Sequence, residues 1–328
     1  MPRYFLGVDI GGTKSHALIA NERGRALGFG RGGPGNWEDV GWEGTRAVLD
    51  DIMAQATAQA GIERDDISAA GLGLAGYDWP EDDPPYQAII HELLRPDLSL
   101  ALVNDALIGL WAGSDAGWGL VVAAGTSCNC YGRNTRGEVG RGVGSSYFGE
   151  YAGAEELVWW AVQAVAHAWA RRGPDTRLSE ALVAAASARD VSDLLAGLMR
   201  GRYSLSAGNA PLVFDVAAEG DPVALDLVRR AGHELGKLAL GVSRQIGLTT
   251  LAFDVVLSGS FFKGSPLIQE SMAETIRSAA PEARLVRLTA PPVVGAVLLG
   301  IEQARFDYHA IRRDLIASTN RLLASDCQ

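Results

Sequence analysis

The sequence predicts a two-lobed α/β protein, in which a mixed β-sheet flanked by helices is built twice along the chain. Apolar runs of strand length alternate with helical periodicity in the order β-β-β-α-β-α-β-α as far as about residue 113. Three further strand-like runs begin at residue 119 and are again followed by helices and strands. Glycine turns follow strand-like runs in both halves. The repetition is one of topology rather than of sequence.

The first half opens with three successive strand-like runs joined by Gly11-Gly12 and by residues 21–24. A segment with apolar residues spaced for one helix face follows, and strands then alternate with helices. The expected elements are strands at 4–10, 15–21, 25–31, 68–74 and 98–103, and helices at 39–60, 86–94 and 106–113.

The second half contains the same kinds of segment with several extra helices between residues 152 and 246. We expect strands at 119–124, 128–132, 138–143, 253–257 and 284–288, and helices at 152–171, 177–186, 191–199, 209–219, 221–246, 265–279 and 292–303. Trp159, Trp160 and Trp169 fall at core-like spacing in the first of these helices, so we expect them to pack inside. The final stretch 308–323 is amphipathic.

Composition and charge exclude several classes of protein. The 328 residues are 48% hydrophobic and 21% charged, as in ordinary globular proteins, and the net charge of −10 argues against a nucleic-acid binder. Cys128, Cys130 and Cys327 form no disulfide framework, which favours a reducing compartment. The most apolar helical segment, 157–170, is too short to span a bilayer. We expect a soluble cytoplasmic protein that binds neither nucleic acid nor membrane.

The first glycine turn follows a strand-like run that carries one acid, Asp9. Gly11, Gly12 and Thr13 come next, and glycines there let backbone N–H groups approach an anion. An aspartate at the end of a strand can hold Mg²⁺ through water. The pattern therefore indicates a phosphate site with a metal beside it, and the ammonium of Lys14 would lie near the phosphates. The alternative is a tight hairpin in which the glycines serve the turn alone.

A second turn, Gly125-Thr126-Ser127, repeats this arrangement in the other half. Asn104 and Asp105 stand where another strand-like run ends and a helical pattern begins, a place where open α/β sheets present groups to ligands. Phosphoryl transfer needs a carboxylate to take the proton of the acceptor hydroxyl, and Asp105 is the candidate. The alternative for Asp105 is a helix N-cap.

These motifs resemble the sugar kinase, Hsp70 and actin superfamily. Within it the sequence is similar to the BadF/BadG and N-acetylglucosamine kinase branch from Gly7 to about Gly300, most specifically in DIGGTKS, GLGLAGYD, the Asn104-Asp105 pair, AGTSCN and PPVVGAVLLG. The resemblance implies two ribonuclease-H-like lobes (the actin-like ATPase fold) with a deep inter-lobe cleft that closes on its ligands. The first lobe would span residues 1–115, the second 116–307, and the terminal helix 308–328 would pack back on the first.

The resemblance also implies roles for particular residues. Asp105 would be the catalytic base, and Asp9 the Mg²⁺ anchor. ATP would be held by Gly11, Gly12, Thr13, Lys14, Gly125, Thr126, Ser127, Gly259 and Ser260, and the sugar by Asn36, Gly76, Asp105, Thr126 and Glu150. Asn36 lies in a Gly/Pro-rich loop, so its alternative role is to form a turn. Glu150 and Val143 stand where the family has an aspartate and a tryptophan, and the alternative for Glu150 is a solvated or capping acid.

The function implied is ATP-dependent phosphorylation of a hexose amino sugar, N-acetylglucosamine or glucosamine, at the 6-hydroxyl, by a homodimer. Two alternatives remain. The ATPase activators of 2-hydroxyacyl-CoA dehydratases and benzoyl-CoA reductases share this fold, but none of the three cysteines here is placed like their cluster ligands. A sugar or nucleotide sensor without turnover would not need the base at Asp105.

Overall fold

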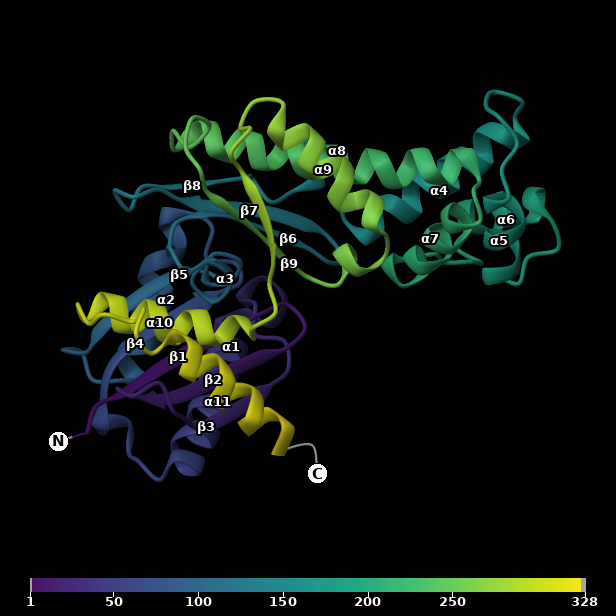
Figure 1. Cartoon of the computed structure of the whole chain (residues 1–328). Coiled ribbons are helices and arrows are strands. Elements are labelled where there is room, and N and C mark those ends of the chain that lie inside the picture. The colour runs from purple at the N-terminus through teal and green to yellow at the C-terminus, as the bar shows by residue number, and fades with distance from the viewer. Residues whose placement is uncertain (1, 326–328) are drawn as a thin grey trace. The chain divides into compact units, whose positions relative to one another are not determined.

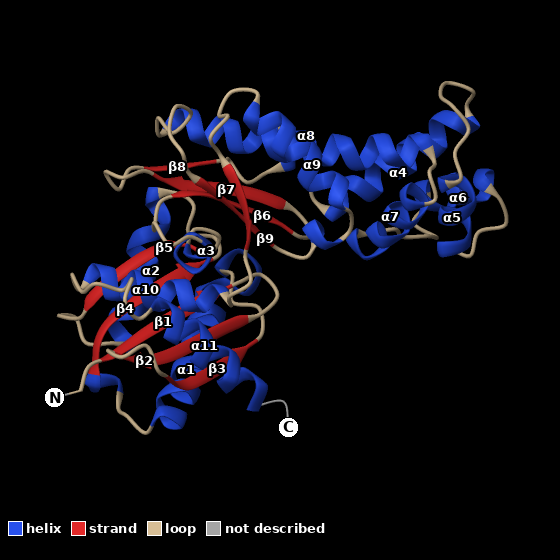
Figure 2. Cartoon of the chain, viewed as in Figure 1, coloured by secondary structure: helices blue, strands red, loops and turns tan. Residues whose placement is uncertain are grey.

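The computed structural model describes residues 2–325 and divides them between two units, each built on a five-stranded β-sheet (Figures 1 and 2). The first unit contains the residues up to Gly119 and those from Val286 onward, and the second contains Leu120–Leu285. The division differs from the expected lobes, because segment 286–307 belongs to the first unit. Its helix packs on the first sheet, as described below.

The first unit has the strand order β3-β2-β1-β4-β5. Strands β1 and β2 pair antiparallel, as do β2 and β3, whereas β1-β4 and β4-β5 are parallel. The strands are β1 (Tyr4–Ile10), β2 (Ser15–Asn21), β3 (Ala26–Gly32), β4 (Ile67–Leu74) and β5 (Ser99–Asn104). The helices are α1 (Trp37–Ala60), α2 (Asp83–Leu93), α3 (Ile108–Gly113), α10 (Pro292–Gln303) and α11 (Arg312–Ser325).

Helix α10 packs directly onto the backbone of the first sheet. A Cβ atom on Gly7 of β1 would lie 2.5 Å from Val297 Cγ2, and one on Gly71 of β4 would lie 2.2 Å from the carbonyl oxygen of Ala296. Both distances are far below van der Waals contact, so only glycine fits at these two positions. The close approach explains why α10 joins the first unit and not the second.

Helix α11 also lies against the first unit, beside β3 (Figure 1). The hydroxyl of Ser318 accepts a hydrogen bond from the N–H of Ala26 (3.0 Å) and donates one to the carbonyl of Gly24 (2.9 Å). The terminal helix is thus tied to the turn between β2 and β3.

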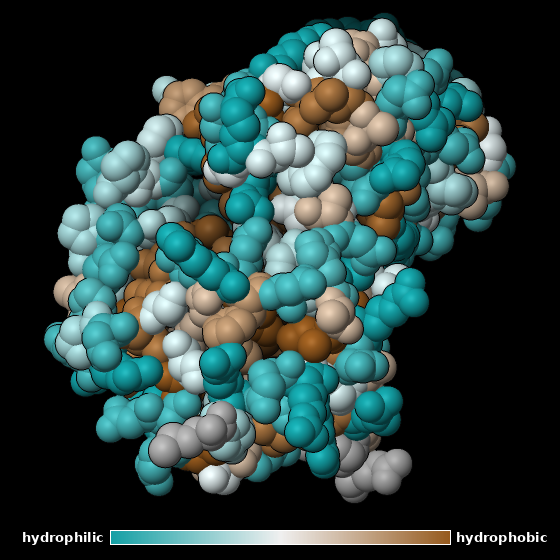
Figure 3. Space-filling model, turned by 60° about the vertical axis from the view of Figure 1, so that its left-hand side comes forward, coloured by the Kyte–Doolittle hydropathy of each residue, from teal (hydrophilic) through white to brown (hydrophobic). Residues whose placement is uncertain are grey.

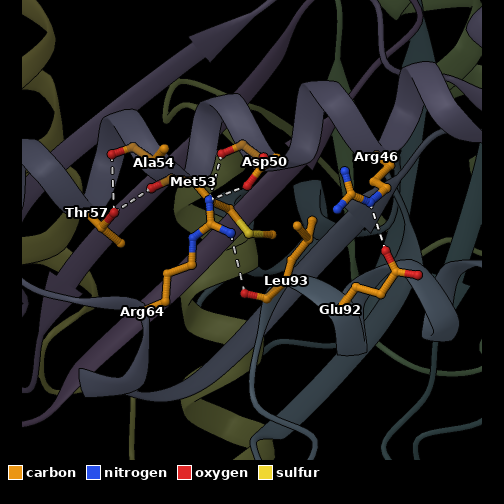
Figure 4. A network of polar contacts seen from close by, with 8 residues as sticks. All are labelled: Arg46, Asp50, Met53, Ala54, Thr57, Arg64, Glu92 and Leu93. Atoms are coloured by element: carbon orange, nitrogen blue, oxygen red, sulfur yellow. Dashed lines mark hydrogen bonds and ion pairs between the residues drawn. The ribbon is translucent and has the colours of Figure 1, made fainter.

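Arginine side chains link α1 to the segments that follow it (Figure 4). Arg64 donates from Nη2 to both the carbonyl and the carboxylate of Asp50, at 2.9 and 2.7 Å, and from Nη1 to the carbonyl of Leu93. Arg46 donates to Glu92 at 2.8 Å. Exposed ion pairs contribute little stability each, so their effect is to fix the end of α2 against α1.

The second unit has the strand order β10-β9-β6-β7-β8, which matches the order of the first unit when that is listed from its other edge, β5-β4-β1-β2-β3. Its strands are β6 (Gly119–Ala124), β7 (Cys128–Arg133), β8 (Val139–Arg141), β9 (Asp254–Ser258) and β10 (Arg284–Arg287). Its helices are α4 (Ala154–Trp169), α5 (Leu178–Ala185), α6 (Val191–Met199), α7 (Ala210–Ala218), α8 (Pro222–Gln245) and α9 (Pro266–Arg277). In both units three consecutive strands are extended by two later ones, which confirms the predicted duplication of topology.

Element boundaries follow the sequence prediction closely, with two differences near the predicted site. Strand β8 is shorter than expected, because residues 143–145 form a loop held by a carboxylate described below. Helix α3 begins at Ile108 rather than at 106. Within residues 2–325, no helix combines the length and apolar character needed to cross a membrane. Hydrophilic side chains cover most of the face drawn in Figure 3.

Candidate active site

The predicted base and the predicted metal anchor lie at the same edge of the first sheet. The N–H of Ala75, which follows β4, donates to the carbonyl of Ile10 at the end of β1 (2.9 Å). The N–H of Asp105, which follows β5, donates in turn to the carbonyl of Leu74 (3.3 Å). Parallel pairing brings the carboxyl ends of these strands together. Asp9, one residue before the end of β1, is therefore close to Asp105.

Three carboxylates interact at this edge. Burial, together with the neighbouring charges of Asp9 and Asp78, raises the pKa of Asp105 from its ordinary value of 3.8 to about 7. A carboxylate with a pKa near neutrality can both accept and release a proton at physiological pH. The charge arrangement fits a general base and not an inert surface acid.

The N-cap alternative for Asp105 is wrong, because α3 begins later and has no side-chain cap. Its N-cap residue is Leu107. The side chain that serves the turn before α3 is that of Asn104, whose Oδ1 accepts from the N–H of Ala106 (2.9 Å). The amide of Asn104 also donates from Nδ2 to Asp78 Oδ1 (3.0 Å). Asn104 therefore shapes the turn and orients Asp78, while Asp105 does not cap the helix.

Asp78 is a site residue that the sequence prediction did not assign. It ends the GLGLAGYD motif, and its own N–H donates to Asp82 Oδ2 (2.9 Å). The motif was a usable signal, since it contains an acid in the loop after a strand that pairs with the Asp9 strand. Nothing in the local sequence around Asp78 indicated that its charge would act on Asp105, because the two residues are far apart in the chain.

The first glycine turn is closed by its own backbone. The N–H of Gly11 donates to the carbonyl of Lys14 (3.1 Å), and residues 12–14 are exposed. A Cβ on Gly11 would lie 2.8 Å from that carbonyl oxygen. Close approach, rather than a positive φ, is what requires glycine here. The carboxylate of Asp9 lies 3.8 Å from the His16 ring on the adjacent strand.

The donor set suits a magnesium ion that is held mainly by substrate. No group of three or more His, Cys, Asp or Glu side chains that could hold a metal occurs among residues 2–325. Mg²⁺ usually keeps several waters and binds through one or two carboxylates together with phosphate oxygens. The carboxylate of Asp9 at the glycine turn fits that mode of binding.

Asn36 and Gly76, two predicted sugar contacts, are neighbours in the structure. Gly76 has a φ of +74°, and a Cβ there would lie 2.4 Å from Asn36 Oδ1. The Trp37 ring N–H donates to the carbonyl of Gly76 (2.7 Å). Asn36 is also the N-cap of α1, since its Oδ1 accepts from the N–H of Glu38 (3.2 Å). Asn36 thus has a structural role as a helix cap, which differs from the turn-forming role considered as its alternative, and a sugar contact would be additional.

An aromatic cluster supports the loop that contains Gly76. Trp37 stacks on Trp42 with ring centroids 4.6 Å apart, and Trp42 meets Tyr86 edge to face at 5.1 Å. The Tyr86 hydroxyl donates to the carbonyl of Ala75 (2.7 Å). Packed rings of this kind hold a loop rigidly, because few rotamers remain available to them. The cluster was not predicted from the sequence.

In the second unit, the turn after β6 is bonded to the start of α4. The N–H of Gly125 donates to the carbonyl of Ser127 (2.9 Å), which closes the turn. The first-turn N–H groups of Ala154 and Glu155 donate to the carbonyls of Gly125 and Thr126, at 2.9 and 3.0 Å. The N–H groups of the helix thus hold the carbonyls of the turn in place, while Thr126 and Ser127 remain exposed.

Gly259 and Ser260 lie next to that turn. Gly259 has a φ of +106°, and a Cβ there would lie 2.1 Å from the carbonyl oxygen of Ala124, at the end of β6. Both residues are exposed. The structure therefore brings together the predicted nucleotide residues 125–127 and 259–260, although more than a hundred residues separate them in the sequence.

The Glu150 carboxylate is occupied by the loop that precedes it. Its Oε1 accepts from the N–H of Val143 (2.7 Å), and its Oε2 accepts from those of Gly144 and Ser145. A carboxylate that accepts several backbone N–H bonds organises a loop strongly. These bonds are why β8 ends early. They support neither solvation nor helix capping, and they make Glu150 a loop-organising residue.

Two sheets of identical strand order with glycine turns at their strand ends define the fold of actin-like sugar kinases. A solved Chromobacterium violaceum protein assigned as an N-acetylglucosamine kinase superposes with a TM-score of 0.66 at 24% identity, covering 90% of this chain and 98% of that one. A ROK family glucokinase from Streptomyces griseus, in complex with glucose and AMPPNP, gives 0.57 at 20% identity, covering 92% and 100%. Both likenesses confirm the predicted fold.

The model of the BadF/BadG/BcrA/BcrD ATPase family matches residues 6–300, and the chain belongs to this family. N-acetyl-D-glucosamine kinase of Dictyostelium discoideum is 24% identical over 314 residues, covering 92% of this chain and 98% of that protein. N-acetylmuramic acid/N-acetylglucosamine kinase of Clostridium acetobutylicum is 23% identical, covering 90% and 98%. The family predicted from the sequence motifs is thereby confirmed.

The raised pKa of Asp105 predicts how stability changes with pH. The folded state ionises this carboxyl near pH 7 and the unfolded chain near 3.8, so stability is lost as pH rises from about 4 to about 7. Asp105→Asn removes that loss. In the absence of Mg²⁺, the free energy of unfolding of Asp105→Asn should therefore rise relative to that of the wild type by about 1–4 kcal/mol between about pH 4 and pH 7. The lower end is expected because the Asp105 side chain is partly exposed to solvent. Above about pH 7 the difference should stay constant.

Urea unfolding between pH 4 and pH 8 measures this difference. Asp65→Asn, which removes an exposed carboxyl in the turn before β4, is measured in parallel as the control for the loss of one negative charge. A pH-independent advantage of Asp105→Asn would contradict the raised pKa.

Proposed function

We propose that this protein transfers the γ-phosphoryl group of ATP to the 6-hydroxyl of a hexose amino sugar, N-acetylglucosamine or glucosamine. The observation that carries the proposal is Asp105, a carboxylate with a pKa near 7 at the strand-end edge, flanked by Asp9 and Asp78. The names of the similar proteins support an amino sugar as the acceptor.

Asp105 acts as the base in the proposed reaction. Its carboxylate accepts the proton of the sugar hydroxyl as the sugar oxygen bonds to the γ-phosphorus. The bond from that phosphorus to the β,γ-bridging oxygen breaks, and ADP leaves with the electron pair. Because the pKa of Asp105 lies near neutrality, a substantial fraction of the carboxylate is ionised at neutral pH and is basic enough to take the proton.

The nucleotide is held, in this proposal, by exposed backbone turns. Backbone N–H groups at 11–14 and at 125–127 would bind phosphate oxygens, and Gly259 with Ser260 would lie along the adenosine. Mg²⁺ held at Asp9 would neutralise phosphate charge. Family resemblance leads us to propose further that the protein acts as a homodimer in the cytoplasm.

The acceptor is assigned mainly to the first unit. Asn36, Gly76 and Asp105 would contact the sugar, with Thr126 contributing from the nucleotide turn. Glu150 is proposed for the sugar as well, and its bonds to the N–H groups of residues 143–145 favour an indirect role in which it shapes that loop. We propose in addition that the carboxylate of Asp78, which Asn104 holds in place, accepts a hydrogen bond from a sugar hydroxyl.

The two alternatives are less well supported. Cluster-binding activators need cysteine thiolates, but Cys128 and Cys130 are buried in β7, and burial raises the pKa of Cys128 to about 12 and that of Cys130 higher still. Cys327 lies outside the described residues. A sensor without turnover would have no use for a base of raised pKa at Asp105.

A coupled assay of ADP release tests the proposal. The purified chain with Mg-ATP is offered glucosamine, N-acetylglucosamine, N-acetylmannosamine, N-acetylmuramic acid and glucose. We expect one of the first two to give the highest kcat/KM, with the phosphate at C6 by NMR of the product. ADP release that is the same with and without every sugar would contradict a sugar kinase.

Asp105→Asn separates base catalysis from structure. It keeps the size of the side chain but removes the charge and most of the basicity, so kcat should fall at least about a hundredfold. ATP affinity and the folded state should be unchanged, which calorimetry and circular dichroism measure. Near-normal kcat would show that another group takes the proton.

Two substitutions at Asn36 separate sugar contact from helix capping. Serine caps a helix about as well as asparagine, whereas alanine does not. Because both remove the amide, both Asn36→Ser and Asn36→Ala should raise the KM for sugar by roughly three- to tenfold while the KM for ATP stays constant. A wild-type KM in Asn36→Ser would mean that Asn36 serves only as the cap of α1.

A further inference from the structure

The second unit contains a pocket of about 740 Å³ that the proposed reaction does not use. It is formed by the loop at residues 146–151, by α4, by the end of α6 and by Leu205 beyond it. Cavities of several hundred Å³ are the size that small molecules occupy. Aliphatic and aromatic side chains make up most of its lining, and every lining residue belongs to the second unit.

Large aromatic side chains line this pocket while remaining exposed. The side chain of Trp159 is 54% exposed and that of Tyr147 is 87% exposed. The prediction that Trp159 and Trp169 pack in the core is therefore wrong for both, whereas Trp160 is buried, with the Arg230 guanidinium 4.2 Å from its ring centroid. Adjacent residues on a helix point in different directions, so Trp160 serves the core and Trp159 faces the pocket. Exposed aromatic groups in a hollow are typical of binding sites.

The charges of the pocket are of one sign. Glu155 and Glu156 line it, and none of the described residues that line it is Lys, Arg or His. Glu156 is only 8% exposed, and its Oε2 accepts from the N–H of Gly153 (2.9 Å). Glu155 Oε2 accepts from the N–H of Ala207 (2.8 Å). Glu155 is exposed, whereas Glu156 is buried among mostly apolar residues. Two carboxylates with no cationic side chain among the described lining residues favour a cation over nucleotides and sugar phosphates as the occupant.

We propose that this pocket binds a small organic ammonium ion. The apolar body of the ligand lies against Trp159 and Tyr147, and its protonated amine lies beside Glu155 and Glu156. Aromatic faces attract cations through the ring quadrupole, most strongly for tryptophan, and the carboxylates add direct charge pairing. None of the residues that line the pocket is assigned to ATP or to the acceptor sugar, although Glu150 belongs to the same loop and the N–H of Glu155 holds the carbonyl of Thr126. The proposal does not depend on the kinase activity.

Three probes of nearly equal shape and different charge test the proposal by isothermal titration calorimetry on the full chain at pH 7. These are 2-phenylethylammonium, 2-phenylethanol and phenylacetate. The ammonium probe should bind about tenfold more tightly than the alcohol, and phenylacetate should bind least. Equal affinities for all three, or no binding of the ammonium probe at millimolar concentration, would overturn the proposal.

Matched variants in one helix locate the binding. Trp159→Ala should weaken the ammonium probe about tenfold. Trp169→Ala, at a residue of α4 that is similarly exposed (57%) and does not line the pocket, should leave its affinity unchanged. Glu155→Gln retains the acceptor for Ala207 but removes the charge, so it should bring the ammonium and alcohol affinities to within about threefold. Thermal melts of the three variants confirm that each is folded.

Two further outcomes would count against the site. An equal loss of affinity in Trp159→Ala and Trp169→Ala would mean that the probe binds nonspecifically to exposed tryptophan. The pocket would instead be assigned to a second copy of the chain if two results were found together. Light scattering would show self-association that Trp159→Ala abolishes, and the affinity for the probe would fall as the protein concentration rises.

Discussion

The parallel pairing of β1, β4 and β5 is the constraint on which the site in the first unit depends. Two backbone hydrogen bonds, from Ala75 to Ile10 and from Asp105 to Leu74, continue that pairing into the loops beyond the strands. As a result Asp9, Asp78 and Asp105 share one edge of the sheet, where burial and the charges of the other two acids raise the pKa of Asp105. The arrangement lowers stability at neutral pH, and a carboxyl of raised pKa is what the proposed proton transfer needs.

The rest of the first unit holds this edge in place. Helix α10 packs against β1 and β4 at Gly7 and Gly71, where no side chain would fit. Asn104 fixes Asp78, and the Trp37–Trp42–Tyr86 stack holds the loop at 75–76. Residues that position a reacting group without touching the substrate are as necessary as the group itself, because errors of about 1 Å lower rates strongly.

The second unit contributes exposed backbone turns, which we propose bind phosphate. Its turn at 125–127 is held from one side by the first turn of α4 and lies next to Gly259, which passes over the end of β6. In this turn the carbonyls of Gly125 and Thr126 are taken up by the helix. The carboxylate of Glu150 likewise holds the loop at 143–145, by accepting hydrogen bonds from its backbone N–H groups. Internal hydrogen bonds thus shape exposed loops that would otherwise be free to move.

Much of this protein could be predicted from the sequence, because the signals concerned are local. Apolar periodicity located the strands and helices. Glycine-rich motifs at strand ends singled out Asp9, Gly11–Thr13 and the second turn, and a strand-to-helix boundary singled out Asn104-Asp105. Which residues lie side by side depended on packing across the sheet. Only the tertiary structure placed Asp78 beside Asn104, assigned α10 to the first unit and exposed Trp159. It also showed Asn36 and Glu150 bonded to backbone N–H groups, since a side chain's partners are decided by chain segments that the local sequence does not specify.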